Sequence, residues 1–352
     1  MSNEVKRNTF TDTTWRRYED NFSRHLLALA RYAQTEMMNA LEKEHGHHQL
    51  RLSFASYITL LNGGGMRLGD LAQKLGISKQ ACNQATNQIE FAGYLTRKVD
   101  PLDGRAKQLV LTAQGRQLSL DGLKIAARLN DRFAEIVGKA AIRSTGTALS
   151  AIYRGAELSR ASGPTHPNPI ILTAGLPGLA DYVLQRLMEM TKRMGHPGLK
   201  LSFSQVLTLM GDAGGKIQHM AAIQDVSKQA ISVIAKELEN LNYISREPDP
   251  RDSRQMLLRF TEHGRELIDH CVVSVDQLER EFIEFAGEEA IAKLKNVLSA
   301  LYHDLHLEQE LTGDIKRVDL SLLAQQLRQQ LGPHASQSLG RLLLPLDSPI
   351  TR

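Results

Sequence analysis

Residues 68–115 read LGDLAQKLGISKQACNQATNQIEFAGYLTRKVDPLDGRAKQLVLTAQG, and residues 217–264 read IQHMAAIQDVSKQAISVIAKELENLNYISREPDPRDSRQMLLRFTEHG. The second stretch repeats the pattern of the first without a gap, and matching positions such as Ser78 and Ser227 lie 149 residues apart throughout. A repeat of this length corresponds to a small domain, because solenoid repeats are only about 20–50 residues long. The sequence therefore predicts a duplicated domain.

The first part of the repeat has the spacing of two short helices. Apolar residues recur every three or four positions before a break at Gly76-Ile77, namely Leu68, Leu71, Ala72 and Leu75. Ser78 is suited to cap a second helix, since its hydroxyl can accept from an otherwise unpaired amide. We expect that helix to reach about Ala92 and to bury Ala81, Ala85 and Ile89, with Ala230, Ile234 and Leu238 as the equivalents in the second copy. Two short helices joined by a tight turn form a helix-turn-helix.

The period changes after Gly93. Residues 94–99 and 107–111 are short and strand-like, and the turn-forming residues 100–104, DPLDG, lie between them. This pattern predicts a β-hairpin, and Thr112 then caps a new helix. A helix-turn-helix followed by a hairpin is a winged helix.

The run from Leu71 to Gly115 resembles the MarR family of bacterial transcriptional regulators. The resemblance is carried by the helix-turn-helix LAQKLGISKQA, by the wing residues Asp100, Pro101, Asp103 and Arg105, and by the segment after the wing with Leu111, Thr112 and Gly115. The second copy repeats the wing as Asp249, Pro250, Asp252 and Arg254, and the following segment as Phe260, Thr261 and Gly264. Winged helices in general are weakly informative, but these two segments found twice in register are specific.

The resemblance implies a mainly α fold with two small β-wings. A member of the family dimerises through its terminal helices to present two winged helices to DNA. Because this chain carries both, we expect two MarR-like winged-helix units that form an intramolecular pseudo-dimer. An association of two chains, which would give four wings, is the alternative.

Composition sets broad limits on the class of protein. The chain has 352 residues, of which 42% are hydrophobic and 23% charged, and its net charge is +4. These values are ordinary for a globular protein and permit nucleic-acid binding without arguing for it. Two distant cysteines cannot form a disulfide framework, the N-terminus lacks a secretory signal, and no apolar run approaches about 18 residues. We expect a cytoplasmic protein, associated with the bacterial nucleoid when bound to DNA.

Residues 163–169, GPTHPNP, are the clearest linker signal, because three prolines oppose helix formation. We expect a first unit at 1–160, a Pro/Gly linker at 161–174, a second unit at 175–312, and an additional C-terminal helix and tail at 313–352. Helices are expected at Trp15–Leu41 after frayed residues 1–14, at Ser53–Leu61, at 116–153 as one helix or two, at Leu179–Met194, at Leu201–Met210, at His263 to about Phe285, at Glu288–His306 and at Asp314–Leu331.

The outer face of the helix after Ser78 is rich in amides. Its candidate DNA-binding residues are Ser78, Lys79, Gln80, Asn83, Gln84 and Asn87. Asn and Gln can bridge the N6 and N7 edge of adenine in the major groove, and a merely polar surface is the alternative. The second copy offers Ser227, Lys228, Gln229, Ser232, Val233 and Lys236. Val233 suits a thymine methyl and Lys236 a phosphate, so we expect the two copies to read unlike half-sites.

Arg105 and Arg254 follow the wing turns. A guanidinium at a hairpin tip suits a narrow, electronegative minor groove, whereas an ion pair with Asp103 or Asp252 is the alternative. The second helix-turn-helix is less regular, because Gln224 and Asp225 replace Leu75 and Gly76. This difference predicts an altered turn and leaves full engagement of the second copy open.

Other reactive residues have simpler interpretations. Cys82 and Cys271 are expected to be buried hydrophobic residues rather than redox sensors. His45, His47 and His48, with His25, are similar to residues of metal-sensing relatives, but their spacing fits no ligand set, so we expect an exposed terminus and no metal. No nucleophile–base pair, phosphate loop or paired carboxylate motif is present, which predicts a protein that is not an enzyme and needs no cofactor.

The resemblance thus implies a sequence-specific regulator that binds double-stranded DNA, most simply a repressor. Relatives release DNA when a small aromatic or anionic effector enters a crevice between the helical base and the winged helix. Tyr32, Tyr57 and Arg31 are candidates for lining such a crevice. The alternative from another class is a protein–protein interaction scaffold without DNA binding, docking through residues 314–331.

Overall fold

The computed structural model describes residues 12–101, 103–158, 170–212, 214–224, 226–249 and 252–308. The described residues up to Leu307 belong to one compact unit. The helix predicted at 314–331 and the tail after it lie outside the described residues. No helix of the described part is long and apolar enough to cross a membrane.

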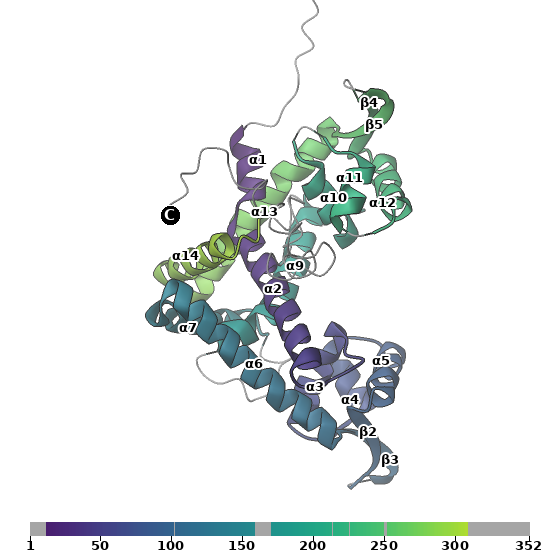
Figure 1. The fold of residues 1–352 in the computed structure, drawn as a ribbon, viewed down its shortest axis with the longest axis vertical. Coiled ribbons are helices and arrows are strands. Elements are labelled where there is room, and N and C mark those ends of the chain that lie inside the picture. The colour runs from purple at the N-terminus through teal and green to yellow at the C-terminus, as the bar shows by residue number, and fades with distance from the viewer. Residues whose placement is uncertain are drawn as a thin grey trace, which may run out of the picture. The chain divides into compact units, whose positions relative to one another are not determined.

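The first half alternates helices with one small sheet (Figure 1). Its elements are α1 (Asp12–Glu19), α2 (Phe22–Lys43), the short 3-10 helix η1 (Leu52–Phe54), α3 (Ala55–Asn62), β1 (Met66–Arg67), α4 (Leu68–Leu75), α5 (Lys79–Phe91), β2 (Leu95–Asp100), β3 (Asp103–Leu111), α6 (Ala113–Val137) and α7 (Lys139–Gly155). We call residues 55–111 the first head. The predicted helix-turn-helix and hairpin are both present in it.

The second half repeats this order. Its elements are α9 (Leu172–Arg193), α10 (Leu201–Met210), α11 (Ile217–Gln224), α12 (Lys228–Asn240), β4 (Ile244–Asp249), β5 (Asp252–Phe260), α13 (Glu262–Ala286) and α14 (Glu288–Asp304). We call residues 201–260 the second head. The predicted fold class, mainly α with two small antiparallel wings, is confirmed.

The single helix predicted from Trp15 to Leu41 is wrong, because the chain breaks between α1 and α2. Asn21 adopts an extended conformation with φ −155° and caps α2, accepting from the Arg24 amide at 3.0 Å. Asparagine favours this position over a helix interior, since its short side chain competes for nearby amides. The new helix α1 begins at Asp12, within residues that were expected to be frayed.

The first helix of the second half is longer than predicted. α9 begins at Leu172, within the predicted linker, and its 22 residues equal those of α2. Pro177 lies inside α9. Because proline disfavours a helix interior, the sequence did not predict the turns around it. Tertiary contacts sustain these turns, because Leu172 and Leu176 are buried and the Thr173 hydroxyl donates to the Ala126 carbonyl at 2.7 Å.

Residues 116–153 form two helices rather than one, which decides between the two predicted alternatives. Gly138, with φ +91°, separates α6 from α7, and Gly287, with φ +85°, separates α13 from α14 in the same way. Both positions require a conformation that glycine adopts without strain.

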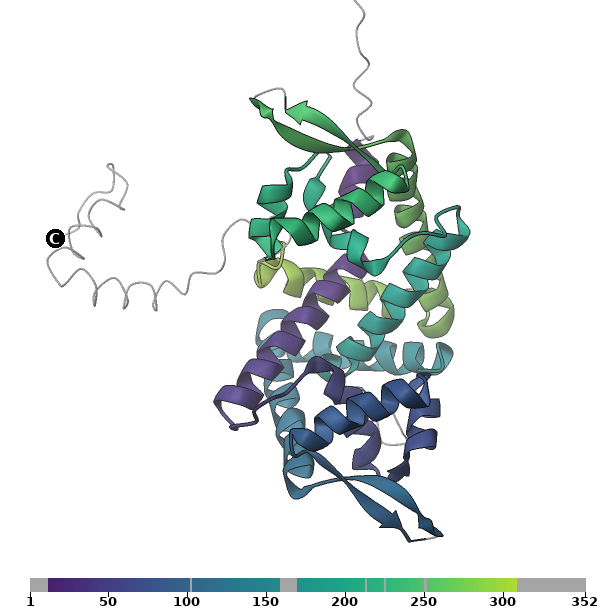
Figure 2. The same ribbon diagram turned by 90° about the vertical axis from the view of Figure 1, so that its right-hand side faces the viewer.

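Helices of the two halves pack against each other between the heads (Figures 1 and 2). α2 packs against α9 and α14, and α7 packs against α13 and α14. The Phe22 ring meets the Phe282 ring edge-on at 5.9 Å between centroids. One chain therefore buries the apolar faces of its own terminal helices.

Each head has its own hydrophobic core, and the second core includes a residue from the chain's beginning. Trp15 of α1 is buried in the core cluster of the second head, with its ring 5.9 Å from that of Phe260. α1 also packs along α13. The N-terminal helix thus completes the core of the more distant head.

The wings close more tightly than the sequence predicts. Asp100 pairs with Asp103 across the first hairpin and Asp249 with Asp252 across the second, so each strand extends into the predicted turn. In the first head β1 joins as a third strand in the order β1-β3-β2, whereas the second head has two strands and an isolated bridge from Gly215 to Leu258.

The glycine that follows each wing has a steric explanation. A Cβ at Gly115 would overlap the Tyr94 carbonyl oxygen, and a Cβ at Gly264 would overlap that of Tyr243. Thr112 and Thr261 cap the following helices, each accepting from the glycine amide at 3.0 Å. The Thr-x-x-Gly pattern thus lets a helix begin directly against the backbone of the residue that precedes each wing, Tyr94 or Tyr243.

Candidate nucleic-acid interface

The second helices of the two helix-turn-helix motifs, α5 and α12, begin in the same way. We call them the recognition helices. Ser78 and Ser227 are extended N-caps whose hydroxyl oxygens accept from the amides of Ala81 and Ala230, each at 3.1 Å. The predicted cap at Ser78 is confirmed and recurs at Ser227. The identical segments SKQA at 78–81 and 227–230 therefore begin their helices with equal local geometry.

The predicted burial of Ile89 and Leu238 is confirmed, whereas the first turn of each helix is rotated from the prediction. In α5 the buried residues are Cys82, Thr86 and Ile89, whereas Ala81 is exposed. In α12 they are Ile231, Ala235 and Leu238, whereas Ala230 is exposed. An alanine near a helix start fits either face, so its apolar side chain does not fix the rotation of the helix. The prediction was wrong for Ala81 and Ala230.

Cys82 is fully buried in the first head, as predicted, and Cys271 is partly buried. Burial raises the pKa of the Cys82 thiol, and burial also raises that of Cys271, to about 12. Since the thiolate is the reactive form, neither environment favours oxidation.

The candidate DNA-binding side chains lie on the outer face. Those of α5 are all exposed, namely Ser78, Lys79, Gln80, Asn83, Gln84 and Asn87. Those of α12 are exposed except for the partly buried Ser232, namely Ser227, Lys228, Gln229, Val233 and Lys236. Val233 is 61% exposed, so its methyl groups are accessible on this face. α5 and α12 lie on the same side of the compact unit in Figure 1, and Figure 2 shows that side.

Arg97 of β2 organises the outer face of α5 and was missed by the sequence analysis. Its Nη2 donates to the Asn87 carboxamide oxygen at 2.7 Å and to that of Asn83 at 3.2 Å, while its Nη1 pairs with Glu90. Because a carboxamide oxygen has two lone pairs, each asparagine keeps an acceptor site and its whole NH₂ group for a ligand. Arg97 therefore fixes which way two groove-facing amides point.

The second head keeps the ion pair but not the amides. Arg246, equivalent to Arg97, donates from Nε to Glu239, equivalent to Glu90, at 2.9 Å. Ser232 and Lys236 stand where the first head has Asn83 and Asn87. The repeated Arg–Glu spacing was the sequence signal that could have revealed Arg97.

The aspartate that opens each wing pattern is a structural residue. Asp100 and Asp249 are buried, and each is paired at 2.6 Å with the cation that precedes the first helix of its helix-turn-helix, Arg67 Nε or Lys216 Nζ. The hydrogen bond to Asp100 raises the pKa of Arg67. These pairs tie the base of each wing to its helix-turn-helix.

Arg105 is exposed on the first wing. The alternative of an ion pair with Asp103 is not what the structure shows, because Asp103 accepts from the Arg105 backbone amide at 3.1 Å and faces Arg67 at 3.5 Å. Among the described residues Arg105 has no ion-pair partner. The side chain of Arg254 lies outside the described part of the chain.

The second helix-turn-helix closes as the first does. The Val226 amide donates to the Ala221 carbonyl at 3.1 Å, and the equivalent bond from Ile77 to Ala72 also measures 3.1 Å. Asp225 itself lies outside the description, so the predicted alteration at that residue stays a prediction.

The histidines at the end of α2 are not all exposed, contrary to the prediction. His47 is buried and its Nε2 lies 3.2 Å from Asp121 Oδ2 on α6. Burial opposes ionisation of Asp121, but hydrogen bonds from Gln117, His47 and Lys124 outweigh it and lower the pKa.

The equivalent position in the second half of the chain, outside the second head itself, is a cluster of imidazoles. His196 is buried, with Nδ1 3.0 Å from the Tyr243 hydroxyl and Nε2 2.9 Å from His270 Nδ1. Burial, followed by the neighbouring His263 and His270, lowers the pKa of His196. The halves thus differ in charge at matched sites, His47–Asp121 against His196–His270.

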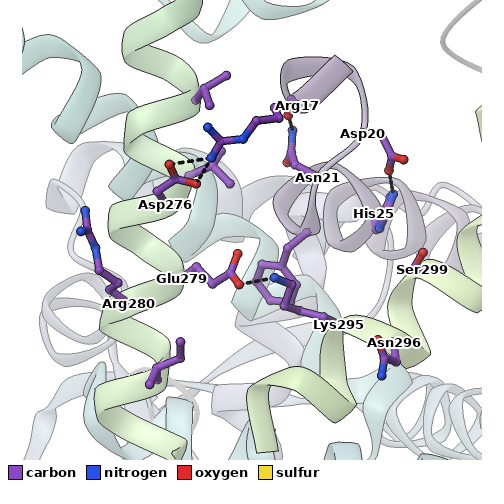
Figure 3. Close-up of a pocket in the computed structure, with 14 residues that line it drawn as sticks. Arg17, Asp20, Asn21, His25, Asp276, Glu279, Arg280, Lys295, Asn296 and Ser299 are labelled. Carbon is purple, nitrogen blue, oxygen red and sulfur yellow. Dashed lines mark hydrogen bonds and ion pairs between the residues drawn. The ribbon is translucent and has the colours of Figure 1, made fainter. Parts of the chain in front are cut away.

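Two cavities adjoin the helices of the base. One of about 680 Å³ lies among α1, α2, α13 and α14 (Figure 3), and one of about 480 Å³ lies between α2 and α6. The three residues predicted to line an effector crevice, Tyr32, Tyr57 and Arg31, line neither cavity. Tyr32 and Tyr57 are buried, and Tyr32 stacks on Phe133 with centroids 6.3 Å apart.

Models of known protein families match the sequence of both heads. Residues 58–106 match the model of the MarR family, and residues 192–271 match the model of the transcriptional regulator SarA/Rot. No relative among the curated proteins matches the sequence. Both matched families consist of transcriptional regulators and not of enzymes.

Similar solved structures align with a part of the chain. The transcriptional regulator Tm0710 of Thermotoga maritima is 21% identical, covers 36% of this chain and 93% of its own, and gives a TM-score of 0.28. The YusO protein of Bacillus subtilis is 21% identical, covering 38% and 89% with a TM-score of 0.29. A MarR family regulator of Rhodococcus sp. RHA1 is 24% identical, covering 35% and 91% with a TM-score of 0.27.

The two family models, rather than these alignments, identify the heads. They fall on opposite sides of residues 163–169 and cover the two copies of the repeat in large part. The chain therefore carries two MarR-like winged helices in tandem, one in each half.

Proposed function

We propose that the chain is a sequence-specific regulator of transcription that binds double-stranded DNA through α5 and α12 together. The observation that carries the proposal is the pair of equally capped recognition helices, exposed on one side of a single compact unit. The predicted contact residues on both helices, with Arg105 and Arg254 on the wings, form the proposed interface.

We further propose that the chain is its own dimer. The packing of α2 on α9 and of α7 on α14 supports this, because these contacts join the terminal helices of the two halves. One protein chain then supplies both recognition helices, as a monomeric pseudo-dimer. The predicted domain boundaries after residues 160, 174 and 312 remain predictions.

The two heads are proposed to read unlike half-sites. The first presents amides that suit adenine, and the second presents Val233 and Lys236, which suit a thymine methyl and a phosphate. The target is then an imperfect palindrome. Selection of bound duplexes from a random pool tests this, and recovery of a perfect palindrome contradicts it.

Salt dependence separates this function from a protein–protein scaffold. Displacement of counterions from phosphates makes log K fall linearly with log salt, with a slope of about −0.9 per neutralised phosphate. We expect a steep decline for the selected duplex, measured by fluorescence anisotropy. If no duplex is selected and salt leaves the weak binding unchanged, the scaffold replaces the regulator.

The sign of regulation and the effector are finer parts of the proposal. We propose that the regulator is a cytoplasmic repressor that occludes a promoter. The 680 Å³ cavity among α1, α2, α13 and α14 is the candidate site for a small effector, and Arg280 of its lining is the proposed partner of an anionic group. Release of the selected duplex by aromatic carboxylates, absent in Arg280→Ala, tests this assignment.

A further inference from the structure

Three potential metal ligands from opposite ends of the chain meet beside the helical base. Asp20 lies between α1 and α2, His25 lies on the second turn of α2, and His303 lies on the last turn of α14. One oxygen or nitrogen donor of each residue lies within 4.8 Å of the other two. We propose that Asp20, His25 and His303 bind a divalent transition-metal ion of the zinc class.

The chemistry of the three donors fits such an ion. Two imidazoles and one carboxylate are a common set for zinc, with a solvent molecule in the fourth position. At bond lengths of about 2.1 Å, tetrahedral donors lie about 3.4 Å apart. The three donors lie within 4.8 Å of one another, and the exposed side chains of Asp20 and His303 can rotate to bring the spacings to that value.

The surroundings of His25 fix the position of its imidazole. Its side chain is only 7% exposed, its Nε2 lies 2.6 Å from Asp20 Oδ1, and its ring packs on Tyr302 with centroids 4.4 Å apart. The His303 ring lies edge-on to it at 5.6 Å.

An ion can reach the site from the neighbouring cavity. Asp20 and His25 lie on the edge of the 680 Å³ cavity, where Figure 3 shows them side by side. The nearest cation in sequence, Arg24, is engaged with the Thr208 hydroxyl at 3.4 Å and lies over the Tyr18 ring. The sequence spacing hides the site, because 278 residues separate His25 from His303.

The position of the site gives the ion a structural consequence. An ion there joins the turn between α1 and α2 to α14, and α1 carries Trp15 into the core of the second head. Metal binding therefore fixes α1 against the base and stabilises the second head. This inference is independent of DNA binding.

Calorimetric titration of the full chain with Zn²⁺ tests the site. We expect His303→Ala and Asp20→Asn each to remove one bound Zn²⁺ equivalent or to raise its Kd on the order of 100-fold. Removing a partner outside the ligand set already weakens metal binding by about 10–100-fold, so the loss of a ligand should reach the upper end of that range. His219→Ala, which removes an exposed imidazole from α11, is the matched control and should bind as the original chain does.

Trp15, the single tryptophan of the sequence, gives a second readout. Co²⁺ should quench its fluorescence and produce visible absorption bands of tetrahedral intensity, and both effects should vanish in His303→Ala. Zn²⁺ should raise the unfolding midpoint followed by Trp15, because an ion bound only to the folded state stabilises it. Equal Zn²⁺ titrations for His303→Ala and the original chain would overturn the proposal, whatever the DNA measurements give.

Discussion

The first and second heads share a backbone plan but differ in how their outer faces are organised. In the first, Arg97 holds two asparagine amides in fixed orientation on α5. In the second, Arg246 makes only the ion pair with Glu239, and Lys236 replaces one of the amides. Duplication therefore preserved the elements that position a recognition helix and changed those that face outward.

The comparison also separates two kinds of repeated residue. The caps Ser78 and Ser227 and the wing aspartates Asp100 and Asp249 recur with matching contacts, because each satisfies backbone or buried charge. Such residues report the fold and not the ligand. The residues that distinguish the heads are the ones that report what each head binds.

The largest effect is expected from giving the first head the second head's residues. Asn83→Ser combined with Asn87→Lys should weaken binding of the selected duplex by about 2–6 kcal/mol, since each well-placed amide–adenine pair contributes about 1–3 kcal/mol. Fluorescence anisotropy measures the change. The reciprocal exchange, Ser232→Asn with Lys236→Asn, is the matched control and should shift the preferred second half-site toward adenine. Unchanged preference in both exchanges would mean that these positions do not read bases.

The next largest effect concerns the wings. Arg105→Ala should cost about 1–3 kcal/mol of DNA affinity, because the guanidinium has no ion-pair partner among the described residues and is available to the minor groove. Titration of the selected duplex against the variant gives this value. Lys107→Ala, an exposed cation on the same strand, controls for the loss of one positive charge. Equal losses in both variants would reduce Arg105 to a general phosphate contact.

A smaller effect is expected from the arginine on β2. Arg97→Met should weaken DNA binding by about 1–2 kcal/mol, because Asn83 and Asn87 lose the partner that orients them and a charge-assisted hydrogen bond is removed. Arg246→Met should change affinity less, since no outer-face amide depends on it. Thermal unfolding of both variants separates loss of orientation from loss of fold. A larger affinity loss for Arg246→Met would reverse the assignment of roles.

The smallest expected effect is a difference between the two halves in how their stability depends on pH. His196 has a lowered pKa when folded, so it is neutral in both states above about pH 6.5, and below that value the unfolded state takes up the proton first. The second head should therefore lose stability as the pH falls from 7.5 to 5.5. The lowered pKa of Asp121 keeps its contribution in the first head intact until the pH falls below about 4.

His270→Asp copies the His47–Asp121 pair of the first half into the second and should reduce the loss of stability at pH 5.5, because a carboxylate beside His196 favours its protonated form. Unfolding followed by Trp15 fluorescence monitors the second head, whose core contains that residue. Asp121→Asn, tested at the same two pH values, is the control in the first head. A pH response that His270→Asp leaves unchanged would exclude His196 as its source.

Local signals in the sequence were sufficient for the heads. The serine caps, the Gly76 turn and the Thr-x-x-Gly segments each encode a backbone conformation within a few residues, so the winged helices could be predicted. Element boundaries that depend on packing could not. α9 begins at Leu172 despite Pro177, because buried contacts with the other half outweigh the local preference.

The site was predictable only in outline. Exposure of Asn83 and Asn87 follows from helical spacing, but the rotation that buries Cys82 and exposes Ala81 depends on the neighbouring helices. Arg97 lies ten residues beyond Asn87 and reaches it only because the hairpin folds back. The proximity of His25 to His303 depends on the packing of α14 against α2, which no local pattern encodes.

The placement of Trp15 has a consequence for how the protein is made. α1 leaves the ribosome long before the core that receives it, which is complete only after Phe260 and Ile268 have been synthesised. Until then its tryptophan remains exposed while the first head, which needs no residue from the second half, can already close. Domains emerging in order usually fold in order, but here α1 must wait until the second head has been synthesised, so a change that displaces α1 would disturb the core of the second head.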